Sequence, residues 1–523
     1  MDKLVIFSFL SLHIFVVSFG VENAATLSSF CSQTPYPDLC NSLTITTKSP
    51  QTTLDQNPFN VRDAALKFTL SHAENVHKSI STTNISSFNE LAKSAWADCV
   101  ELYEDTIHNL NRSINSANPS NAQTWLSAAI ANHQTCQNGF LDFQLSSHLQ
   151  SFPFLVANNF SKHLSNSLAI NKAASKQIKG RRLLNSNGFP EWLSFADRKL
   201  LQSSNGAVKA DIIVAQDGSG NYKTIGEALA AAKKRRGSSR FVIYVKKGVY
   251  KENVEVTKTM KNIKIVGDGI DATIVTGSKN VQDGSTTFRS ATFAVKGSGF
   301  IAQDMTFENT AGPQKHQAVA LRSGSDFSVF YRCSFKGYQD TLYVHTQRQF
   351  YRDCDIYGTQ DFIFGDAAVV FQNCNIYLRK PLSYQKNTVT AQGRKDPNEN
   401  TGIIIHNSRI TVSSDFRSLG GSIKSYLGRP WEKYSRTVIM KSVIDSVIDP
   451  AGWLPWSGKF ALSTLYYGEY MNSGPGAGTS GRVKWDGFHV INSPAEAGKF
   501  SVGNFLDGNS WIPGTGVPFS SGL

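Results

Sequence analysis

The sequence lacks the signatures of the most common catalytic sites. It contains no Gly-x-Ser-x-Gly segment, so a serine-hydrolase nucleophile has no support. It has no Cys-x-x-Cys pair and no His/Cys cluster with zinc-ligand spacing, which argues against a metal site. The Gly218-Ser219-Gly220 turn has Lys223 where a dinucleotide-binding fingerprint needs a third glycine. Any reaction chemistry must come from other residue types.

Long apolar runs are also absent, except at the N-terminus. Lys3 precedes an apolar run over residues 4–19, which is shorter than the ~20 residues needed to span a bilayer. Small residues follow around Ala24 and Ala25. This order predicts a secretory signal peptide over residues 1–25 and no membrane association after its removal. The alternative is a retained N-terminal anchor.

Cysteine is scarce, with seven in 523 residues. Export would place them in an oxidising compartment, where pairing is expected. The four early cysteines can close as two bridges, whereas the odd number of late ones leaves one thiol free. The early set is Cys31, Cys40, Cys99 and Cys136, and the late set is Cys333, Cys354 and Cys374.

The charge balance is basic and unevenly placed. The formal net charge is +13, and from residue 202 onward 38 Lys and Arg stand against 26 Asp and Glu. A basic exported domain suggests an anionic partner, and acidic polysaccharide fits a secreted protein better than nucleic acid. The alternative is an ordinary soluble surface. Three glycosylation sequons, at Asn84, Asn111 and Asn159, all lie in the early part.

Residues 26–175 are predicted to form a four-helix bundle. Apolar residues recur there at steps of three and four, as in one face of a helix. The clearest stripe is Leu91, Ala95, Cys99, Tyr103, Ile107 and Leu110. Short loops between such helices favour a bundle, in which Cys99–Cys136 would join two neighbouring helices and Cys31–Cys40 would close an N-terminal hairpin.

Residues 176–206 are predicted to be a linker with proteolytic processing sites. Two basic pairs each precede paired leucines, in Arg181-Arg182-Leu183-Leu184 and Arg198-Lys199-Leu200-Leu201. The surrounding sequence is polar and rich in Ser and Asn. Repetition of the tetrapeptide at a domain boundary favours cleavage by a processing protease at one of the two sites.

From residue 207 to 523 short β-branched and aromatic runs alternate with glycine, which predicts strands. Three runs, 329–335, 349–357 and 370–377, repeat one pattern, and their cysteines are almost evenly spaced at positions 333, 354 and 374. That period fits one turn of a solenoid, so we expect a parallel β-helix rather than a β-sandwich. Neighbouring turns lie within disulfide reach, and we favour Cys354–Cys374 over Cys354–Cys333.

Two carboxylates follow the same repeat. The separation of Asp340 and Asp361 along the chain equals that of Cys333 and Cys354, which places the two acids on one face of neighbouring turns. Asp361 is followed by Phe362, Ile363 and Phe364, an apolar setting for an acid. Two close acids in such a setting should titrate apart, as a general acid and a nucleophile require. The alternative is a pair of turn aspartates without chemistry.

Five motifs give the sequence a family resemblance. GVYKE (248–252), QAVALR (317–322), GYQDTL (337–342), DFIFG (361–365) and LGRPW (427–431) occur in the order seen in pectin methylesterases. Residues 26–175, with their four cysteines, resemble the pectin methylesterase inhibitor domain. The resemblance implies a right-handed parallel β-helix in a secreted cell-wall (apoplast) enzyme. It also implies hydrolysis of galacturonate methyl esters in pectin without a cofactor or metal.

The same resemblance assigns roles to individual residues. It implies that Asp361 is the nucleophile, that Asp340 is the general acid and then base, and that Gln339 and Gln317 stabilise the oxyanion. Arg429 would hold a carboxylate, either that of Asp361 or that of a free galacturonate. Trp431 would stack on a sugar ring and Thr287 would contact substrate. Tyr250, Glu252, His316 and His345 are expected to be structural or to lie at the rim of the groove.

Asp366 departs from the pattern, because some relatives have asparagine there. We expect its carboxylate either to repel acidic substrate or to raise the pKa of a neighbouring acid.

Alternative functions remain open at this stage. A β-helix that only binds polysaccharide should have lost the acidic pair or its glutamine neighbours, and both are present. A pectin lyase or polygalacturonase would need a calcium-binding acidic cluster or carboxylates flanking a glycosidic bond. The helical region could act as a separate inhibitor, as an intramolecular inhibitor or as a folding and retention segment. Separate inhibitor proteins are a further possible class of partner.

Overall fold

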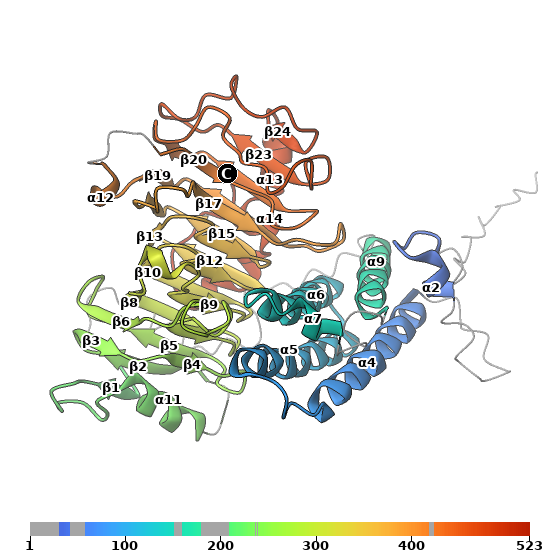
Figure 1. Ribbon diagram of the computed structural model, residues 1–523, viewed down its shortest axis with the longest axis horizontal. Helices are drawn as coiled ribbons and strands as arrows, with labels where there is room; N and C mark the ends of the chain where they lie inside the picture. The colour runs from blue at the N-terminus through green and yellow to red at the C-terminus, as the bar shows by residue number, and fades with distance from the viewer. Residues whose placement is uncertain are drawn as a thin grey trace, which may run out of the picture.

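The computed structural model describes residues 31–41, 58–150, 159–178 and 209–523, apart from 236, 238 and 418–422. The signal peptide predicted for 1–25 and both processing sites of the predicted linker lie outside these residues. The chain forms a helical bundle packed against the side of a long stack of strands (Figure 1).

The helical bundle consists of four long helices in which each packs against two others. They are α4 (Pro58–Thr82), α5 (Glu90–Ile114), α6 (Pro119–Leu141) and α9 (Phe160–Ile178), with the short α2 (Pro37–Asn41) and α7 (Ser146–Gln150) beside them. Asn89 caps α5 by accepting a hydrogen bond from the Ala92 N–H at 2.8 Å, and Pro119 begins α6, where no N–H partner is needed. The predicted bundle is confirmed.

The strands form three parallel stacks, as the predicted β-helix requires. Two stacks belong to one sheet, because β8 (Ile301–Asn309) and β10 (Ser328–Lys336) each run through both. The first stack also contains β1 (Ile212–Val214), β2 (Phe241–Val245), β5 (Ile263–Val266), β12 (Arg348–Arg352), β15 (Ala368–Gln372), β18 (Gly402–His406), β21 (Arg436–Met440), β23 (Tyr466–Tyr470) and β24 (Phe488–Val490). The second contains β3 (Gly248–Lys251), β6 (Thr273–Gly277), β13 (Asp355–Gly358), β16 (Asn375–Leu378), β19 (Arg409–Val412) and β22 (Val443–Ile444).

The third stack is a separate sheet and faces the helical bundle. Its members are β4 (Val254–Val256), β7 (Phe293–Val295), β9 (Leu321–Ser323), β11 (Leu342–Val344), β14 (Ile363–Gly365), β17 (Asn387–Gln392) and β20 (Ser425–Gly428). The remaining helices are short and surround the strands: α11 (Ile225–Lys233), α12 (Ser414–Arg417), α13 (Pro494–Gly498) and α14 (Val502–Phe505). The predicted parallel β-helix is confirmed.

The strand register matches the period predicted from the sequence. Leu342 pairs with Ile363, at the same separation along the chain as Asp340 and Asp361. Arg348 pairs with Ala368, at the same separation as Cys354 and Cys374. Inside the coils Phe330, Tyr351 and Phe371 stack in a ladder with ring centroids 4.6 Å apart at each step. Stacking of equivalent apolar residues therefore fills the core.

The cysteines divide into two groups with different outcomes. The predicted Cys31–Cys40 and Cys99–Cys136 disulfides are present, and the second joins α5 to α6. The predicted Cys354–Cys374 disulfide is wrong, because all three late cysteines are buried free thiols. Cys354 Sγ donates to the Phe330 carbonyl at 3.3 Å, and Cys374 Sγ donates to the Tyr351 carbonyl at 3.7 Å. These two thiols are thus satisfied by backbone of the preceding coil, whereas Cys333 Sγ donates to the Tyr331 carbonyl of its own strand at 3.5 Å.

Helix α6 lies between the other helices and the third stack. Most of its residues are buried, on more than the one face that bundle packing would cover. One continuous apolar cluster joins Leu126 and Phe140 of the bundle to Phe288, Tyr343 and Phe364 of the β-helix. The two parts therefore share a core along the face of the third stack (Figure 1).

Candidate active site

Asp340 and Asp361 occupy equivalent turns on neighbouring coils. Leu342 of β11 pairs with Ile363 of β14, and each aspartate lies two residues before one of these partners. Both have positive φ, 62° and 51°, a conformation that aspartate adopts more readily than most residues. The Asp340 N–H donates to the Gln360 carbonyl at 3.1 Å, which ties the two turns together. The repeat thus brings both carboxyl groups to one face.

Asp361 is held by a guanidinium fork. Arg429 Nε lies 2.9 Å from Asp361 Oδ1, and its NH2 lies 2.6 Å from Oδ2. The Thr388 hydroxyl donates to Oδ1 at 2.6 Å and accepts from the Asp361 N–H at 2.8 Å. A two-point ion pair with an added hydroxyl fixes the plane of the carboxylate and stabilises its negative charge. This is the arrangement that a carboxylate nucleophile needs.

Asp340 has the opposite environment. It is 8% exposed, and none of the hydrogen bonds or ion pairs among the described residues involves its carboxyl group. Burial raises the pKa of Asp340 well above its usual range, and the nearby charges of Asp361 and Asp142 raise it further, against an opposing effect of Arg429. This environment favours the protonated carboxyl group, which makes Asp340 a candidate for a general acid.

The two acids line a cavity of about 440 Å³ between the β-helix and the bundle. All seven residues singled out from the sequence contribute to its wall: Asp340, Asp361, Gln339, Gln317, Thr287, Arg429 and Trp431. The structure therefore brings the whole predicted set together. A cavity of this size, with acids, amides and aromatic rings in its wall, can hold one or two sugar units of a larger polymer.

Several residues of this site were not predicted. Tyr343, Phe364 and Trp456 add aromatic surface to the cavity, and Trp456 also stacks against the Arg429 guanidinium, whose carbon lies 4.3 Å from the ring centre. Phe364 and Trp431 contact edge to face at 6.0 Å. The Phe-Ile-Phe sequence after Asp361 was a signal for this apolar wall. Trp456 lies far along the chain from it, and Thr388 lies on the next coil beyond a long connecting loop, so neither had such a signal.

Glycine is required where the wall is thinnest. A Cβ on Gly393 would lie 2.9 Å from the Trp431 ring, so a larger residue would displace this indole. Gly365 has φ of 128°, and a Cβ there would lie 2.1 Å from the Val344 carbonyl oxygen. Both glycines thus let the coils approach closely beside the site.

Asp366 lies behind the site and does not line the cavity. It is buried, and its Oδ1 accepts hydrogen bonds from Gln392 at 3.0 Å and Thr401 at 2.5 Å. Burial raises the pKa of Asp366 to about 6. Burial and the adjacent Asp366 together raise the pKa of Glu399 well above its usual range. Asp366 was expected either to repel acidic substrate or to raise the pKa of a neighbouring acid. The structure supports the second effect, and the acid affected is Glu399 rather than Asp340 or Asp361.

The residues expected to be structural or at the rim do not line this cavity. Glu252 accepts the Ile225 and Gly226 N–H groups at the start of α11, at 3.0 and 2.9 Å. The Tyr250 hydroxyl donates to the Lys246 carbonyl at 2.9 Å. His345 is buried against the Thr135 hydroxyl, 3.0 Å away, and burial lowers its pKa well below the usual value.

The helical bundle closes the open side of this cavity. Asp142, directly after α6, accepts a hydrogen bond from the Thr287 N–H at 2.8 Å, and Thr135, Asn138, Gly139, Leu141 and Gln144 complete the wall. Burial raises the pKa of Asp142 to about 6. A side chain of the bundle therefore occupies the space beside the two catalytic candidates.

Charged and aromatic contacts anchor the bundle on either side. Asp98 of α5 pairs with Arg289 at 2.5 Å and accepts from the Thr286 hydroxyl at 2.6 Å. Trp125 of α6 donates from its indole N–H to Asp326 at 2.9 Å. Arg289 precedes β7 and Asp326 follows β9 in the third stack, so contacts at both ends of these strands hold the bundle in place.

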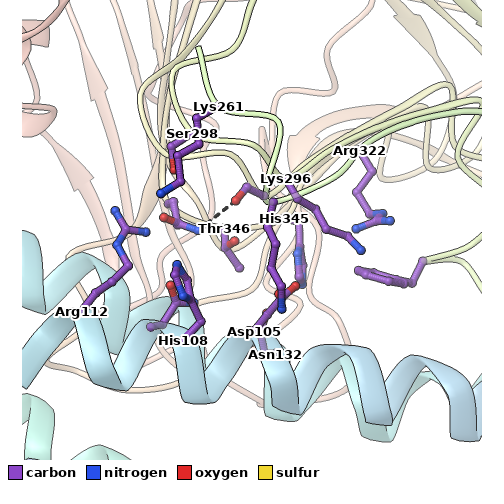
Figure 2. Close-up of a pocket in the computed structure, with 15 residues that line it drawn as sticks. Asp105, His108, Arg112, Asn132, Lys261, Lys296, Ser298, Arg322, His345 and Thr346 are labelled. Carbon is purple, nitrogen blue, oxygen red and sulfur yellow. Dashed lines mark hydrogen bonds and ion pairs between the residues drawn. The ribbon is translucent and has the colours of Figure 1, made fainter. Parts of the chain in front are cut away.

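A second cavity, of about 220 Å³, lies between α5 and the β-helix (Figure 2). Arg112 and Asp105 from α5 face Lys296, Arg322 and Lys261 from the β-helix. Basic residues predominate, because Lys258 also lines this space and Asp105 is the only acidic residue among the described residues of its wall. The bundle therefore covers a basic part of the β-helix surface here.

Two kinds of feature are absent from the described residues. None of the helices combines the length and apolarity that crossing a membrane requires. Nor does the described part of the chain contain three or more His, Cys, Asp or Glu side chains placed to hold a metal ion.

Comparison with known proteins identifies relatives of both parts. A family model described as Pectinesterase matches residues 211–509, and one described as Plant invertase/pectin methylesterase inhibitor matches residues 25–170. The chain is 54% identical to "Probable pectinesterase/pectinesterase inhibitor 6" of Arabidopsis thaliana, over 98% of this chain and 96% of that protein. It is 53% identical to "Pectinesterase 2" of Citrus sinensis, over 97% and 96% of the two chains.

A solved structure resembles the β-helix alone. The "Pectin methylesterase from Carrot" is 60% identical and superposes with a TM-score of 0.60. It covers 61% of this chain, and its own chain is covered completely. In that protein the part equivalent to this β-helix therefore folds without a helical bundle attached.

Proposed function

Because the chain belongs to the pectinesterase family, we propose that it hydrolyses the methyl esters of galacturonate units in pectin, with Asp361 and Asp340 as its catalytic residues. The observation that carries this proposal is the contrast between the two acids. Asp361 is held as an oriented anion by Arg429 and Thr388, whereas Asp340 is buried and unpaired among the described residues. One nucleophile and one acid thus face the same cavity.

In the first half-reaction Asp361 attacks the carbonyl carbon of the methyl ester. The side-chain N–H groups of Gln339 and Gln317 stabilise the negative charge on the carbonyl oxygen; loss of one such donor typically lowers kcat by about 10²–10³. Asp340 gives its proton to the methanol oxygen as the C–O bond breaks. The products are methanol and an anhydride between Asp361 and the galacturonate carboxyl group.

In the second half-reaction a water molecule attacks the anhydride. Asp340, now ionised, takes a proton from that water, and Asp361 leaves as a carboxylate. The de-esterified galacturonate unit and the original enzyme are restored. Each proton that Asp340 gives in the first step returns in the second, so the cycle balances without a cofactor.

The remaining predicted residues orient the substrate. The fork between Arg429 and Asp361 supports the first of the two roles considered for Arg429, that of holding the nucleophile. Trp431 offers a flat ring to a sugar, and Thr287 lines the same cavity. The basic net charge of the β-helix part attracts the acidic polymer.

We further propose that the helical bundle keeps the enzyme latent in cis. Asp142 and the residues around it fill the side of the cavity through which a polymer would enter. Cleavage at Arg181–Leu184 or Arg198–Leu201, followed by loss of the bundle, would open the groove to pectin in the cell wall. Three exposed sequons, at Asn84, Asn111 and Asn159, suit a secreted bundle.

One experiment tests both proposals. The full chain, with a recognition site for a specific protease inserted between residues 186 and 206, is assayed for methanol release from highly methylated pectin before cleavage and after cleavage and removal of the bundle. Activity should appear only after removal. Asp361→Asn and Asp340→Asn should each lower that activity by at least about 10³-fold.

Asp353→Asn is the matched control, because Asp353 also lies in a left-handed turn of these coils but outside the cavity. It should retain full activity. Undiminished activity of Asp361→Asn would overturn its role as nucleophile, and full activity of the uncleaved chain would overturn latency. Mass spectrometry of the secreted product would show which basic site is cut.

A further inference from the structure

Gln339 can stabilise an oxyanion in only one of its two orientations. The two ends of a glutamine amide have nearly the same shape, but one donates hydrogen bonds and the other accepts them. If Gln339 turned its oxygen toward the reacting carbonyl, it would repel the developing negative charge. A residue that fixes this orientation therefore controls the rate without touching the substrate.

Gln385 provides such a constraint. It lies in the connection between β16 and β17 and is buried, with 9% of its surface exposed. Its Nε2 donates to Gln339 Oε1 at 3.1 Å. Gln339 is equally buried, at 8%, and its oxygen is occupied by this bond. The Nε2 of Gln339 is then the end directed to the cavity.

The orientation of Gln385 is itself fixed by a group that cannot reverse its role. The backbone N–H of Leu382 donates to Gln385 Oε1 at 3.3 Å. A backbone N–H only donates, so the atom of Gln385 that it meets must be the oxygen. Consequently the other end of Gln385 is a donor, and the atom of Gln339 that it meets must be an acceptor. The direction of each bond follows from the one before.

The loop that carries Gln385 is tied to the turn that carries Gln339. Arg379, at the end of β16, donates to the Gly337 carbonyl at 3.0 Å and to the Tyr338 hydroxyl at 2.8 Å. Asn387 donates to the Arg379 carbonyl at 3.1 Å, which closes the loop. Side-chain hydrogen bonds of Arg379 and Asn387 thus tie together the segments that carry the two glutamines.

From this chain of hydrogen bonds we infer that Gln385 is a positioning residue, which holds the Gln339 amide with its N–H₂ group toward the oxyanion. The inference rests on the proposed function, because it assumes that Gln339 is an oxyanion donor. A donor that is already aligned needs no reorganisation when charge develops, and this lowers the barrier. Reversal of Gln339 would also bring two N–H₂ groups face to face, so the buried pair favours one orientation.

Gln385→Glu tests the inference, because the shape is kept and the donor is removed. Its carboxylate can still accept from Leu382, but Gln339 must turn its N–H₂ group inward to meet the second oxygen. In the esterase freed of its bundle, kcat should fall by about 10², close to the effect of Gln339→Leu, with KM unchanged. Protonation of the new acid restores a donor, so the ratio of variant to wild-type kcat should rise as pH falls.

Gln385→Met removes both hydrogen bonds and introduces no acceptor. We expect a smaller loss of kcat, because Gln339 becomes free to adopt either orientation, and we expect a ratio to wild type that does not change with pH. Ser383→Ala, on the exposed part of the same loop, should leave kcat and KM unchanged. Thermal unfolding midpoints identify any variant that fails to fold, in which case Gln385→Met alone decides.

The double variant Gln339→Leu/Gln385→Glu tests whether Gln385 acts through Gln339 or independently of it. If Gln385 acts through Gln339, Gln385→Glu should cause no further loss in a Gln339→Leu background. Full additivity of the two losses would overturn the positioning role, as would wild-type kcat in both Gln385 variants. An unchanged kcat in Gln339→Leu alone would instead refute Gln339 as an oxyanion donor.

Discussion

The Thr388 hydroxyl makes two hydrogen bonds with Asp361, one with its backbone N–H and one with its carboxylate. The hydroxyl accepts from that N–H at 2.8 Å and donates to the carboxylate at 2.6 Å. The first bond shapes the turn and the second orients the nucleophile. Together with the Arg429 fork they leave Asp361 little freedom to rotate, which favours attack along one direction.

Thr388→Val should therefore slow the reaction without unfolding the protein. Valine has nearly the same shape, but the carboxylate loses a hydrogen bond of the kind that contributes about 1.5–3 kcal/mol. We expect kcat of the freed esterase to fall by about 10- to 100-fold, measured as methanol release from methylated pectin.

Thr388→Ser is the matched control, since it keeps the hydroxyl and loses only a methyl group. It should remain within a few-fold of wild type. An equal loss in both variants would mean that packing of the methyl group, rather than the hydrogen bond to Asp361, sets the rate.

The pairing of Asp340 with Asp361 could be predicted from the sequence, whereas the positions of Thr388 and Gln385 could not. Asp340 and Asp361 follow the period of the repeat, so spacing alone places them together. The next coil is longer. Ile363 pairs with Thr390 there, and these two residues are further apart along the chain than Leu342 and Ile363, which pair on the coil before. A loop of altered length sits between β16 and β17, so the period gives no information on which residues beyond it meet Asp361 or Gln339.

At the scale of elements, helix α6 determines how the two parts meet. Its buried residues include Leu126, Phe140 and Thr135, which lie on different sides of the helix. A helix that is apolar on more than one side indicates burial between two layers, and the sequence carried this signal for docking. The cysteines illustrate the opposite case, because coil spacing allowed a Cys354–Cys374 bridge but did not fix where the two thiols point.

Trp125→Ala should weaken docking of the bundle more than it changes the bundle itself. Trp125 is 8% exposed, donates to Asp326 at 2.9 Å and packs under the Arg112 guanidinium at 4.0 Å. Buried tryptophans at interfaces commonly contribute about 2 kcal/mol or more. Methanol release by the uncleaved chain should rise by about 10-fold or more, and that of the freed esterase should not change, because Trp125 is no longer present.

Trp96→Phe provides the comparison for this prediction. The Trp96 indole donates to the Ile80 carbonyl at 2.9 Å, a contact within the bundle and away from the β-helix. Trp96→Phe should leave methanol release by the uncleaved chain unchanged. A similar release of activity by both variants would show that general loosening of the bundle, rather than the Trp125 contact, opens the groove.

At the scale of the whole molecule, the basic charge of the β-helix has a partner within the same chain. Acidic residues of α5 face its basic residues: Asp98 and Glu101 lie against Arg289, and Asp105 lies against Lys258 at 3.2 Å. The net charge of +13 suggested an acidic polysaccharide. In this structure acidic residues of the bundle cover part of that basic surface, so the bundle and an acidic polysaccharide would compete for it.

Burial of these acids predicts that docking weakens as pH rises. Burial raises the pKa of Asp98 to about 7 and that of Asp142 to about 6, and it also raises that of Asp105. A raised pKa means that the docked form holds protons that the separated parts release. Docking is therefore strongest below the ordinary carboxyl pKa of about 4, and it is lost progressively as pH rises through 6 and 7. The pKa of Glu101 is lowered instead, because the positive charges of Lys296, Arg322 and Arg289 outweigh the effect of its burial. The resulting change in docking occurs only at more acidic pH.

The measurement is the ratio of methanol release by the cleaved, unseparated complex to that by the bundle-free esterase, between pH 5 and 8. This ratio should increase with pH, since the reference removes the pH dependence of catalysis itself. Asp98→Asn, which stays neutral at all pH values, should remove the increase between pH 6 and 7 and reduce it below pH 6, where Asp142 still contributes. A ratio that stays constant or falls with pH would mean that these carboxyl groups remain charged in the docked form, paired with Arg289 and its neighbours rather than neutralised by burial.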